Sequence, residues 1–165
     1  WGYDPGSLSI GLPDVYLTMV QISNEAFELH MDNNNIVSGF QFTIDDAPDY
    51  YVFNDVVATD RLSGFTISWN PQPDGSFTLV AFSLSGDQIA PGTGPLAYIT
   101  YQSTSIYESS ITLDFTYSVL ADDTASEIPH VTESGSVLVS GEEPPPEPPL
   151  PPTAARNSSP IFTKS

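Results

Sequence analysis

The stretch that decides the fold is residues 36–44, which read IVSGFQFTI. After Gly39, apolar residues take every second position, and the polar residues Gln41 and Thr43 take the positions between them. This period of two is typical of a β-strand that buries one face. The stretch therefore predicts a strand whose buried row is Phe40, Phe42 and Ile44.

A second alternating run precedes this strand. Phe27, Leu29 and Met31 recur at every second position, and the polar turn at residues 32–35 (DNNN) separates them from residues 36–44. Asn and Asp tolerate the backbone angles of tight turns, so such a turn favours a hairpin. We therefore expect the two runs to form neighbouring antiparallel strands.

The same pattern continues along the chain. Residues 111–119 alternate most regularly, and in residues 76–84 both phases are apolar, which predicts a central strand buried on both faces. Turn sequences such as residues 71–75 separate the runs, and no helical periodicity occurs. The chain is therefore predicted to be all-β, an antiparallel two-sheet β-sandwich of about nine strands. The other predicted strands are 16–22, 51–58, 65–69, 96–101 and 135–139.

Charge narrows the range of partners. The chain has 21 acidic residues and 3 basic ones, and Arg61 is the only Lys or Arg in residues 1–141. Such a surface repels phosphate groups, so we expect no nucleic-acid binding. No apolar run reaches 18 residues, so we expect no membrane insertion, and the absence of Cys excludes disulfides and thiolate chemistry. Basic proteins and neutral glycans remain as partners.

Six segments of the chain occur in a familiar order: GFQFTI (39–44), FTISWN (65–70), LVAFSLSG (79–86), GTGPLAYITY (92–101), ITLDFTYSVLADDTASEIP (111–129) and GSVLV (135–139). Together they resemble the cohesin module of bacterial extracellular proteins, over about residues 8–140. The resemblance implies a jelly-roll sandwich without catalytic activity that binds a dockerin module on one sheet face. It also implies an extracellular or cell-surface location, which fits a processed start at Trp1.

The composition changes toward both ends of the chain. We expect an irregular lead-in at residues 1–14, a sandwich domain at 15–141, a proline-rich spacer at 142–152 and a C-terminal docking segment at 153–165. The spacer composition is typical of extended polyproline II or of a disordered linker, and both interpretations remain open. One hypothesis is that the tail docks on a neighbouring copy and builds a filament or surface layer. Its docking residues would be Leu150, Ile161 and Phe162.

The two histidines, His30 and His130, are the only side chains whose ordinary pKa lies near neutrality. His30 takes the polar phase of its run, so we place it on the outer face, and His130 follows Pro129 in a predicted loop. No nucleophile elbow, phosphate-binding loop or zinc-binding motif is present. We therefore expect no enzyme activity and no required cofactor.

Two acidic clusters are candidates for calcium binding, because hard oxygen ligands suit Ca²⁺. Neither cluster matches the EF-hand pattern. The alternative is that these side chains cap the backbone of their own turns. The first cluster is Asp45, Asp46 and Asp49, and the second is Asp122, Asp123 and Glu127.

Aromatic residues suggest a second possible function, carbohydrate binding. A flat row of exposed Tyr or Trp can stack on sugar rings, whereas Trp69 shares the phase of Phe65 and Ile67 and is expected in the core. Two functions therefore remain open. One is a non-catalytic scaffold module that binds a dockerin-like protein, or copies of itself, through the polar phase of residues 36–44 and the tail. The other is a carbohydrate-binding module, with the candidate stacking residues Trp1, Tyr3, Tyr50, Tyr51, Tyr98 and Tyr101.

Overall fold

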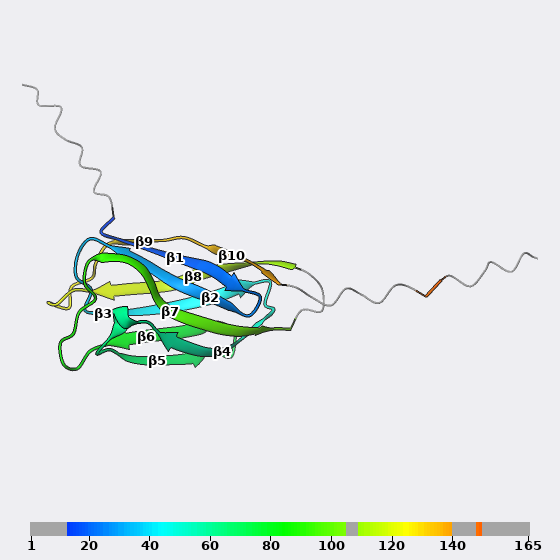
Figure 1. Ribbon diagram of the computed structural model, residues 1–165, viewed down its shortest axis with the longest axis horizontal. Coiled ribbons are helices and arrows are strands. Elements are labelled where there is room, and N and C mark those ends of the chain that lie inside the picture. The colour runs from blue at the N-terminus through cyan, green and yellow to red at the C-terminus, as the bar shows by residue number, and fades with distance from the viewer. Residues whose placement is uncertain (1–12, 105–108, 140–147, 150–165) are drawn as a thin grey trace, which may run out of the picture.

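The computed structural model describes residues 13–104, 109–139 and 148–149 (Figure 1). In these residues the chain forms ten β-strands and one short 3-10 helix, η1 (Asp60–Leu62). None of the helical structure there is long and apolar enough to cross a bilayer. Nearly all of the predicted lead-in and spacer, and the whole docking segment, lie outside the described residues.

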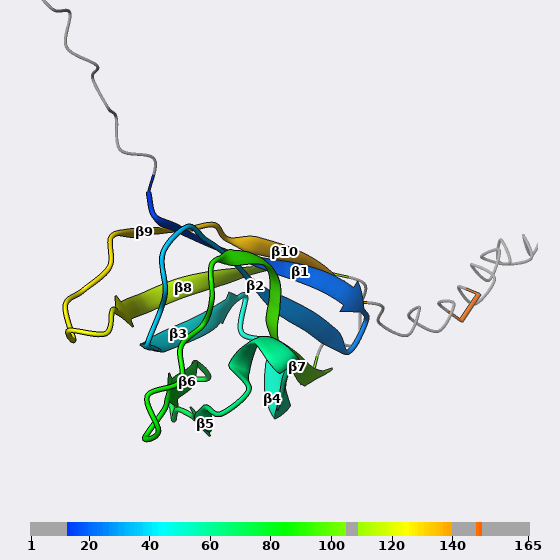
Figure 2. The same ribbon diagram turned by 60° about the vertical axis from the view of Figure 1, so that its left-hand side comes forward.

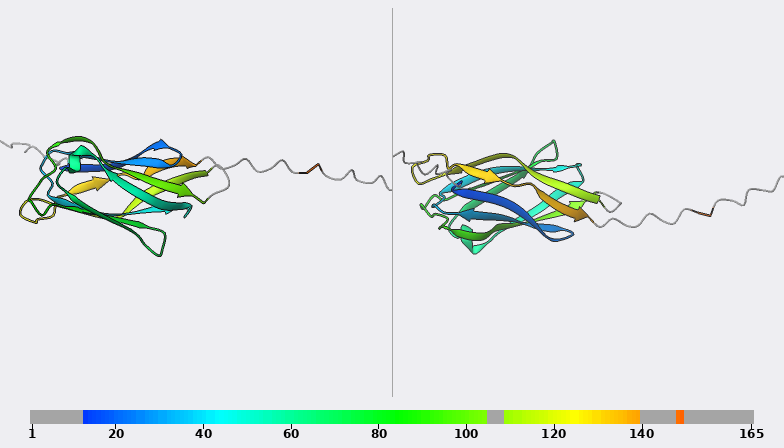
Figure 3. Two further views of the ribbon diagram at one scale, coloured as in Figure 1. Left: turned by 60° about the horizontal axis from the view of Figure 1, so that its bottom comes forward. Right: turned by 90° about the horizontal axis from the view of Figure 1, so that it is seen from above.

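The strands form two five-stranded sheets that pack face to face (Figure 3). This arrangement confirms the predicted two-sheet sandwich. The first sheet has the order β4 (Tyr51–Ala58), β7 (Gly92–Ser103), β2 (Ala26–Asn33), β1 (Val15–Ser23) and β9 (His130–Thr132). The second sheet has the order β10 (Gly135–Val139), β8 (Ser109–Ala121), β3 (Gly39–Ala47), β6 (Phe77–Phe82) and β5 (Thr66–Pro71).

The core lies between the sheets and is rich in aromatic contacts. Phe42 of β3 meets Phe115 of β8 edge to face, with ring centroids 5.7 Å apart. Phe53 of β4 stacks on Phe77 of β6 at 4.9 Å, which joins the two sheets. These ring geometries add to the stabilisation that burial of apolar surface provides. As predicted, the buried row of β3 is Phe40, Phe42 and Ile44.

β2 and β3 lie in different sheets, so the predicted hairpin between them is wrong. β2 pairs with β1 and β7, whereas β3 pairs with β6 and β8. The chain after Asn33 crosses from one sheet to the other: Val37 pairs with Ile89, and the N–H of Ser38 donates to the carbonyl of Ala121 (2.8 Å). These bonds satisfy the backbone of the connection, so it needs no hairpin partner.

β9 is parallel to β1, which is the one departure from antiparallel pairing in the described strands. β8 ends at the same end of the sandwich at which β1 begins, so the chain returns from there in the direction of β1. Figure 2 shows β9 and β10 as consecutive stretches along β1. β9 joins the first sheet and β10 pairs with β8 in the second. His130 therefore begins a strand, not the predicted loop.

β6 lies inside its sheet, between β3 and β5, as predicted, but only one of its faces is buried. Phe77, Leu79 and Ala81 point into the core. On the other face Val80 is half-buried and Phe82 is 40% exposed. Both phases are apolar although no further layer of the described chain covers the outside of this sheet. The expectation of a strand buried on both faces is therefore wrong. The second apolar phase of β6 lies on the outer surface of its sheet.

Arg61 of η1 fixes the start of β7. Its Nη1 donates to the carbonyls of Met31 (2.7 Å) and Gly94 (2.9 Å), and its Nη2 donates to Asn33 Oδ1 (2.6 Å) and to the carbonyl of Gly92 (3.1 Å). Burial lowers the pKa of this guanidinium. The segment before β7 is thus held beside β2, and β7 begins earlier than the sequence predicted. Arg61 is committed to the fold and is not a surface cation.

Candidate interaction surface

The outer face of the second sheet is formed by β8, β3, β6 and β5. The strand alternation that buries Phe42 turns Gln41 and Thr43 outward, and the same alternation exposes the second phase of β6 and β8. Tyr117 is 50% exposed and Phe82 is 40% exposed on this side. We call this surface the β8–β3–β6–β5 face and define it as Gln41, Thr43, Thr66, Ser68, Asn70, Thr78, Val80, Phe82, Tyr117 and Val119.

Register aligns these side chains in rows across the strands. Thr43 pairs with Thr78 on one side and with Tyr117 on the other. The two threonine hydroxyls lie 3.1 Å apart and share a hydrogen bond. In the next row Gln41 pairs with Val80. The centre of the face is therefore a regular mosaic of hydroxyl, amide and apolar groups.

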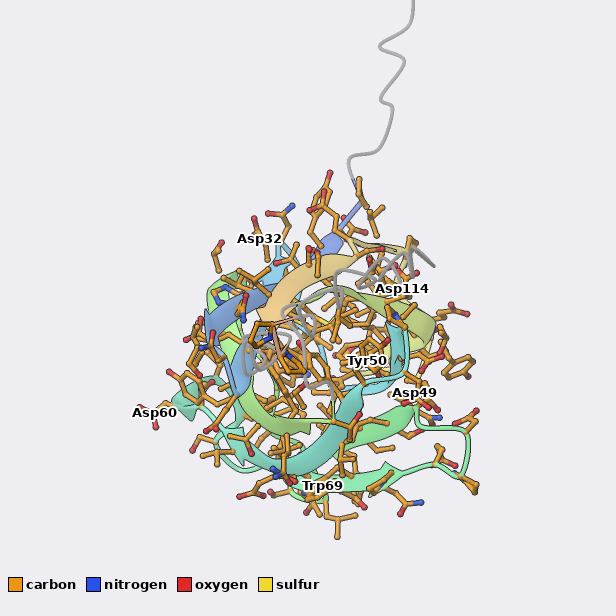
Figure 4. All side chains as sticks on the ribbon, turned by 90° about the vertical axis from the view of Figure 1, so that its right-hand side faces the viewer. Asp32, Asp49, Tyr50, Asp60, Trp69 and Asp114 are labelled. Atoms are coloured by element: carbon orange, nitrogen blue, oxygen red, sulfur yellow. The ribbon has the colours of Figure 1, made fainter. Side chains whose placement is uncertain are left out.

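No side chain of this face is charged, although the chain as a whole carries 21 acidic residues. Carboxylates stand at both ends instead. Asp45 pairs with Asp114 at one end, and Asp122 follows Ala121 at the other. Figure 4 shows Asp114 and Asp49 on the same side of the molecule, opposite Asp60. A neutral centre with aromatic residues and a charged border is the usual composition of a protein–protein interface.

The outer face of the first sheet is different. Val20, Glu28, Tyr98 and Val57 form one row across it. The Glu28 carboxylate meets His30 Nε2 at 2.5 Å in the middle of this face. His30 therefore lies on the outer face, as predicted. This surface also carries exposed apolar groups, but charged groups interrupt its centre, which makes it less suited to close contact with a partner.

The side chain of His130 makes contacts within the domain. Its Nε2 lies 2.7 Å from Ser118 Oγ, and its Nδ1 lies 2.9 Å from the carbonyl of Ile128. The imidazole thus ties the loop before β9 to β8. These contacts are those of a structural residue.

In the first acidic cluster, the side chains of Asp45 and Asp46 accept hydrogen bonds from the backbone of their own turn. Asp46 points inward and is buried. Its Oδ2 accepts from the backbone N–H groups of Tyr50 (2.6 Å) and Tyr51 (3.1 Å), and Asp45 Oδ1 accepts from the N–H of Asp46 (3.0 Å). Burial raises the pKa of Asp46 despite these bonds, and the neighbouring Asp49 and Asp45 carboxylates raise it further. These contacts are backbone caps, which is the alternative interpretation of the cluster.

The second acidic cluster behaves in the same way. Asp122 Oδ1 accepts from Thr124 Oγ1 (2.7 Å) and from the backbone N–H groups of Thr124 (2.8 Å) and Ser126 (2.9 Å), and these bonds lower the pKa of Asp122. Within the described ranges, no three Asp, Glu, His or Cys side chains are arranged to hold a metal ion. Calcium binding at Asp45, Asp46 and Asp49 or at Asp122, Asp123 and Glu127 stays a prediction.

The predicted sugar-stacking residues do not form one surface. Tyr51 and Tyr101 are buried and stack on each other, with ring centroids 4.0 Å apart. Both occupy the core phase of their strands, so neither can present its ring to a sugar. Tyr50 is half-buried in the turn beside Asp49 (Figure 4), and Tyr98 lies on the outer face of the first sheet. Trp1 and Tyr3 lie outside the described residues, as do the docking residues Leu150, Ile161 and Phe162.

Trp69 packs in the core as predicted. It is half-buried, and its ring lies 5.7 Å from that of Phe77. The polar phase of residues 36–44, which we predicted to carry function, contributes Gln41 and Thr43 to the β8–β3–β6–β5 face. Val80, Phe82 and Tyr117 were not among the predicted functional residues. Their signal is the lack of any acidic residue in residues 75–86 and 115–121 of a strongly acidic chain.

Comparisons with known proteins identify the fold. No protein-family model matches the chain, and neither does any curated protein sequence. Several solved structures match. The sixth cohesin of scaffoldin B from Acetivibrio cellulolyticus, solved with a Cel5 dockerin mutant, is 13% identical with a TM-score of 0.64. The match covers 78% of this chain and 99% of that one.

Two further structures give the same result. The OlpC cohesin of Clostridium thermocellum, solved in a cohesin–dockerin complex, is 14% identical with a TM-score of 0.60, over 78% of this chain and 93% of that one. A non-cellulosomal cohesin from the archaeon Archaeoglobus fulgidus is 14% identical with a TM-score of 0.63, over 79% and 94%. The chain therefore has the cohesin fold, which confirms the fold that the sequence resemblance implied.

Proposed function

We propose that this protein is a non-catalytic, extracellular protein–protein interaction module that binds a dockerin-type module on its β8–β3–β6–β5 face. The observation that carries the proposal is the uncharged centre of this face on a chain with a formal net charge of −18. Two structures with the same fold were solved with dockerins, which supports a partner of this class. Function follows the site more than the fold, so the face itself has to be tested.

The charges specify the partner further. Asp45 and Asp114 stand at one end of the face and Asp122 at the other, with no exposed Lys or Arg in the described residues to balance them. A partner that is apolar and hydroxyl-rich in its centre and carries Lys or Arg at both ends would complement this arrangement. A second copy of this chain would bring acids against acids. Electrostatic repulsion thus disfavours self-assembly through the described surface.

Binding of dockerin modules tests the proposal. A panel that includes the dockerins of the matched cohesin complexes is titrated by calorimetry against the full chain and two single variants. Tyr117→Ala removes an aromatic group from the β8–β3–β6–β5 face, and Tyr98→Ala is the matched control on the opposite sheet. Tyr is enriched among the interface residues whose truncation weakens binding about 10-fold or more. We expect this loss for Tyr117→Ala only.

The control also defines failure. Loss of binding in Tyr98→Ala with retention in Tyr117→Ala would move the site to the first sheet. A panel in which no dockerin binds would contradict the proposed partner class. Both side chains are substantially exposed and contribute little to the core, so both variants are expected to fold. Thermal unfolding of each variant checks this expectation.

A further inference from the structure

A short turn follows β6 at the edge of the β8–β3–β6–β5 face. In residues 83–87, Asp87 Oδ2 accepts from Ser85 Oγ (2.5 Å) and from Ser83 Oγ (2.8 Å), and the N–H of Asp87 donates back to Ser83 Oγ (3.0 Å). The two serine hydroxyls lower the pKa of Asp87. The turn is therefore closed by its own side chains.

The turn is also seated against the rest of the domain. The Asp87 carboxylate lies over Gly64, between η1 and β5, where an added Cβ would come within 2.4 Å of it. Gly64 itself has a positive φ of 82°, which favours glycine. Asp87 is thus a positioning residue that fixes the turn relative to the β5 edge of the face.

Leu84 lies at the tip of this turn and is 89% exposed, the largest exposure among the large hydrophobic side chains of the described chain. Single exposed apolar residues are common on protein surfaces. Leu84 differs because hydrogen bonds among Ser83, Ser85 and Asp87 close the turn that carries it, while its own side chain contributes nothing to the core. Phe82, two residues earlier, extends the apolar surface onto the face. A rigid exposed apolar group of this kind loses little entropy on binding.

We infer that Leu84 is an anchor residue that enters an apolar pocket of leucine size on the bound dockerin-type module, with Phe82 against the pocket rim. The inference rests on the proposed function and adds a specificity determinant to it. Phe82 pairs with Gly39, which pairs with Ala121, so Asp122 stands at the same end of the face as the anchor. The pocket on the partner is therefore expected to carry a Lys or Arg at its border.

The experiment measures the Kd of the dockerin that binds the wild-type chain, for four variants of the full chain. Leu84→Ala is expected to weaken binding about 10- to 100-fold, because it removes most of an anchor side chain from a desolvated pocket. Leu84→Met, which keeps the volume, is expected to stay within about 3-fold of the wild type. Leu138→Ala, at an exposed leucine on β10, is the matched control and is expected to bind like the wild type.

The fourth variant separates anchoring from positioning. Ser83→Ala with Ser85→Ala keeps Leu84 but removes the hydroxyls that close the turn. We expect several-fold weaker binding with a more unfavourable binding entropy, since the turn must then be ordered on binding. A thermal unfolding midpoint close to that of the wild type for Leu84→Ala shows that any loss of affinity does not come from misfolding.

The outcomes are distinguishable. If Tyr117→Ala impairs binding while Leu84→Ala leaves the Kd within about 2-fold of the wild type, the face is correct and the anchor inference is overturned. Equal losses in Leu84→Ala and Leu138→Ala also overturn it, because the effect then lacks position dependence. If no dockerin in the panel binds the wild-type chain, the proposed function and this inference both fail.

Discussion

The side chain of Gln21 pairs with the backbone of Leu138 as a neighbouring strand residue would. Its Nε2 donates to the Leu138 carbonyl (2.7 Å), and the Leu138 N–H donates to its Oε1 (2.8 Å). Gln21 belongs to β1 in the first sheet and Leu138 to β10 in the second. One primary amide therefore joins the two sheets near the C-terminal end of β10.

Gln21→Ala should lower the free energy of unfolding by about 1–2 kcal/mol, because both polar groups of Leu138 lose this partner at once. Urea unfolding followed by intrinsic fluorescence measures the change. Gln41→Ala is the control, since Gln41 is exposed on the β8–β3–β6–β5 face. Equal stabilities of the two variants would show that the amide pairing does not hold the sheets together.

Arg61 is predicted to be irreplaceable by lysine. The guanidinium donates to Met31, Asn33, Gly92 and Gly94 at once, and one ammonium group cannot match this geometry. Hydrogen bonds to a charged group contribute about 1.5–3 kcal/mol, so Arg61→Lys should cost on the order of 2 kcal/mol of stability.

Thermal unfolding at constant pH checks the Arg61 prediction. Asp60→Asn serves as the neighbouring control, because Asp60 is exposed in the same 3-10 helix. A Lys variant as stable as the wild type would mean that charge alone, without the fork of donors, is sufficient at this position.

Asp46 is predicted to make stability depend on pH. Burial raises its pKa in the folded state above the ordinary value of 3.8, so folding favours the protonated form. Its contribution is therefore most favourable below about pH 3.8 and is lost as the pH rises through the raised folded-state value. Asp46 Oδ1 is also buried with no hydrogen-bond partner, so ionisation places charge on an unsatisfied atom.

Asp46→Asn removes this titration but leaves a carbonyl oxygen to accept from Tyr50 and Tyr51. Relative to the wild type, the variant should gain free energy of unfolding as the pH is raised from about 4 to 7. Urea denaturation at several pH values measures the difference. A constant difference over this range would show that the pKa of Asp46 is not raised by burial.

Alternation in the sequence was sufficient to predict the buried faces of β2 and β3 but not the partners of these strands. Phe40, Phe42 and Ile44 are buried as their spacing predicts, because a strand with a single apolar phase buries that phase only by facing it toward the core. The same spacing says nothing about which sheet receives the strand. β2 and β3 therefore looked like a hairpin, although bonds from Val37 and Ser38 direct the chain across the sandwich.

The candidate site residues also differ in how far alternation alone predicts their positions. Tyr51 and Tyr101 share the phase of Phe53 and Ile99, and that phase is buried, so the pattern was available in the sequence. The uncharged face was harder to find, because its members come from four strands and only the register brings them together. Leu84 continued the phase of Val80 and Phe82 in the strand predicted over residues 76–84, but the strand ends at Phe82 and Leu84 lies in the turn after it.

The most direct test of the proposed docking face is a binding footprint by NMR on the ¹⁵N-labelled chain, with and without a bound dockerin module. The largest changes in backbone amide shift should fall on β3, β5, β6 and β8 and on the turn at Leu84, with little change in β1, β2 and β7. Changes centred on Val20, Glu28 and Tyr98, or no change with any dockerin in the panel, would contradict it.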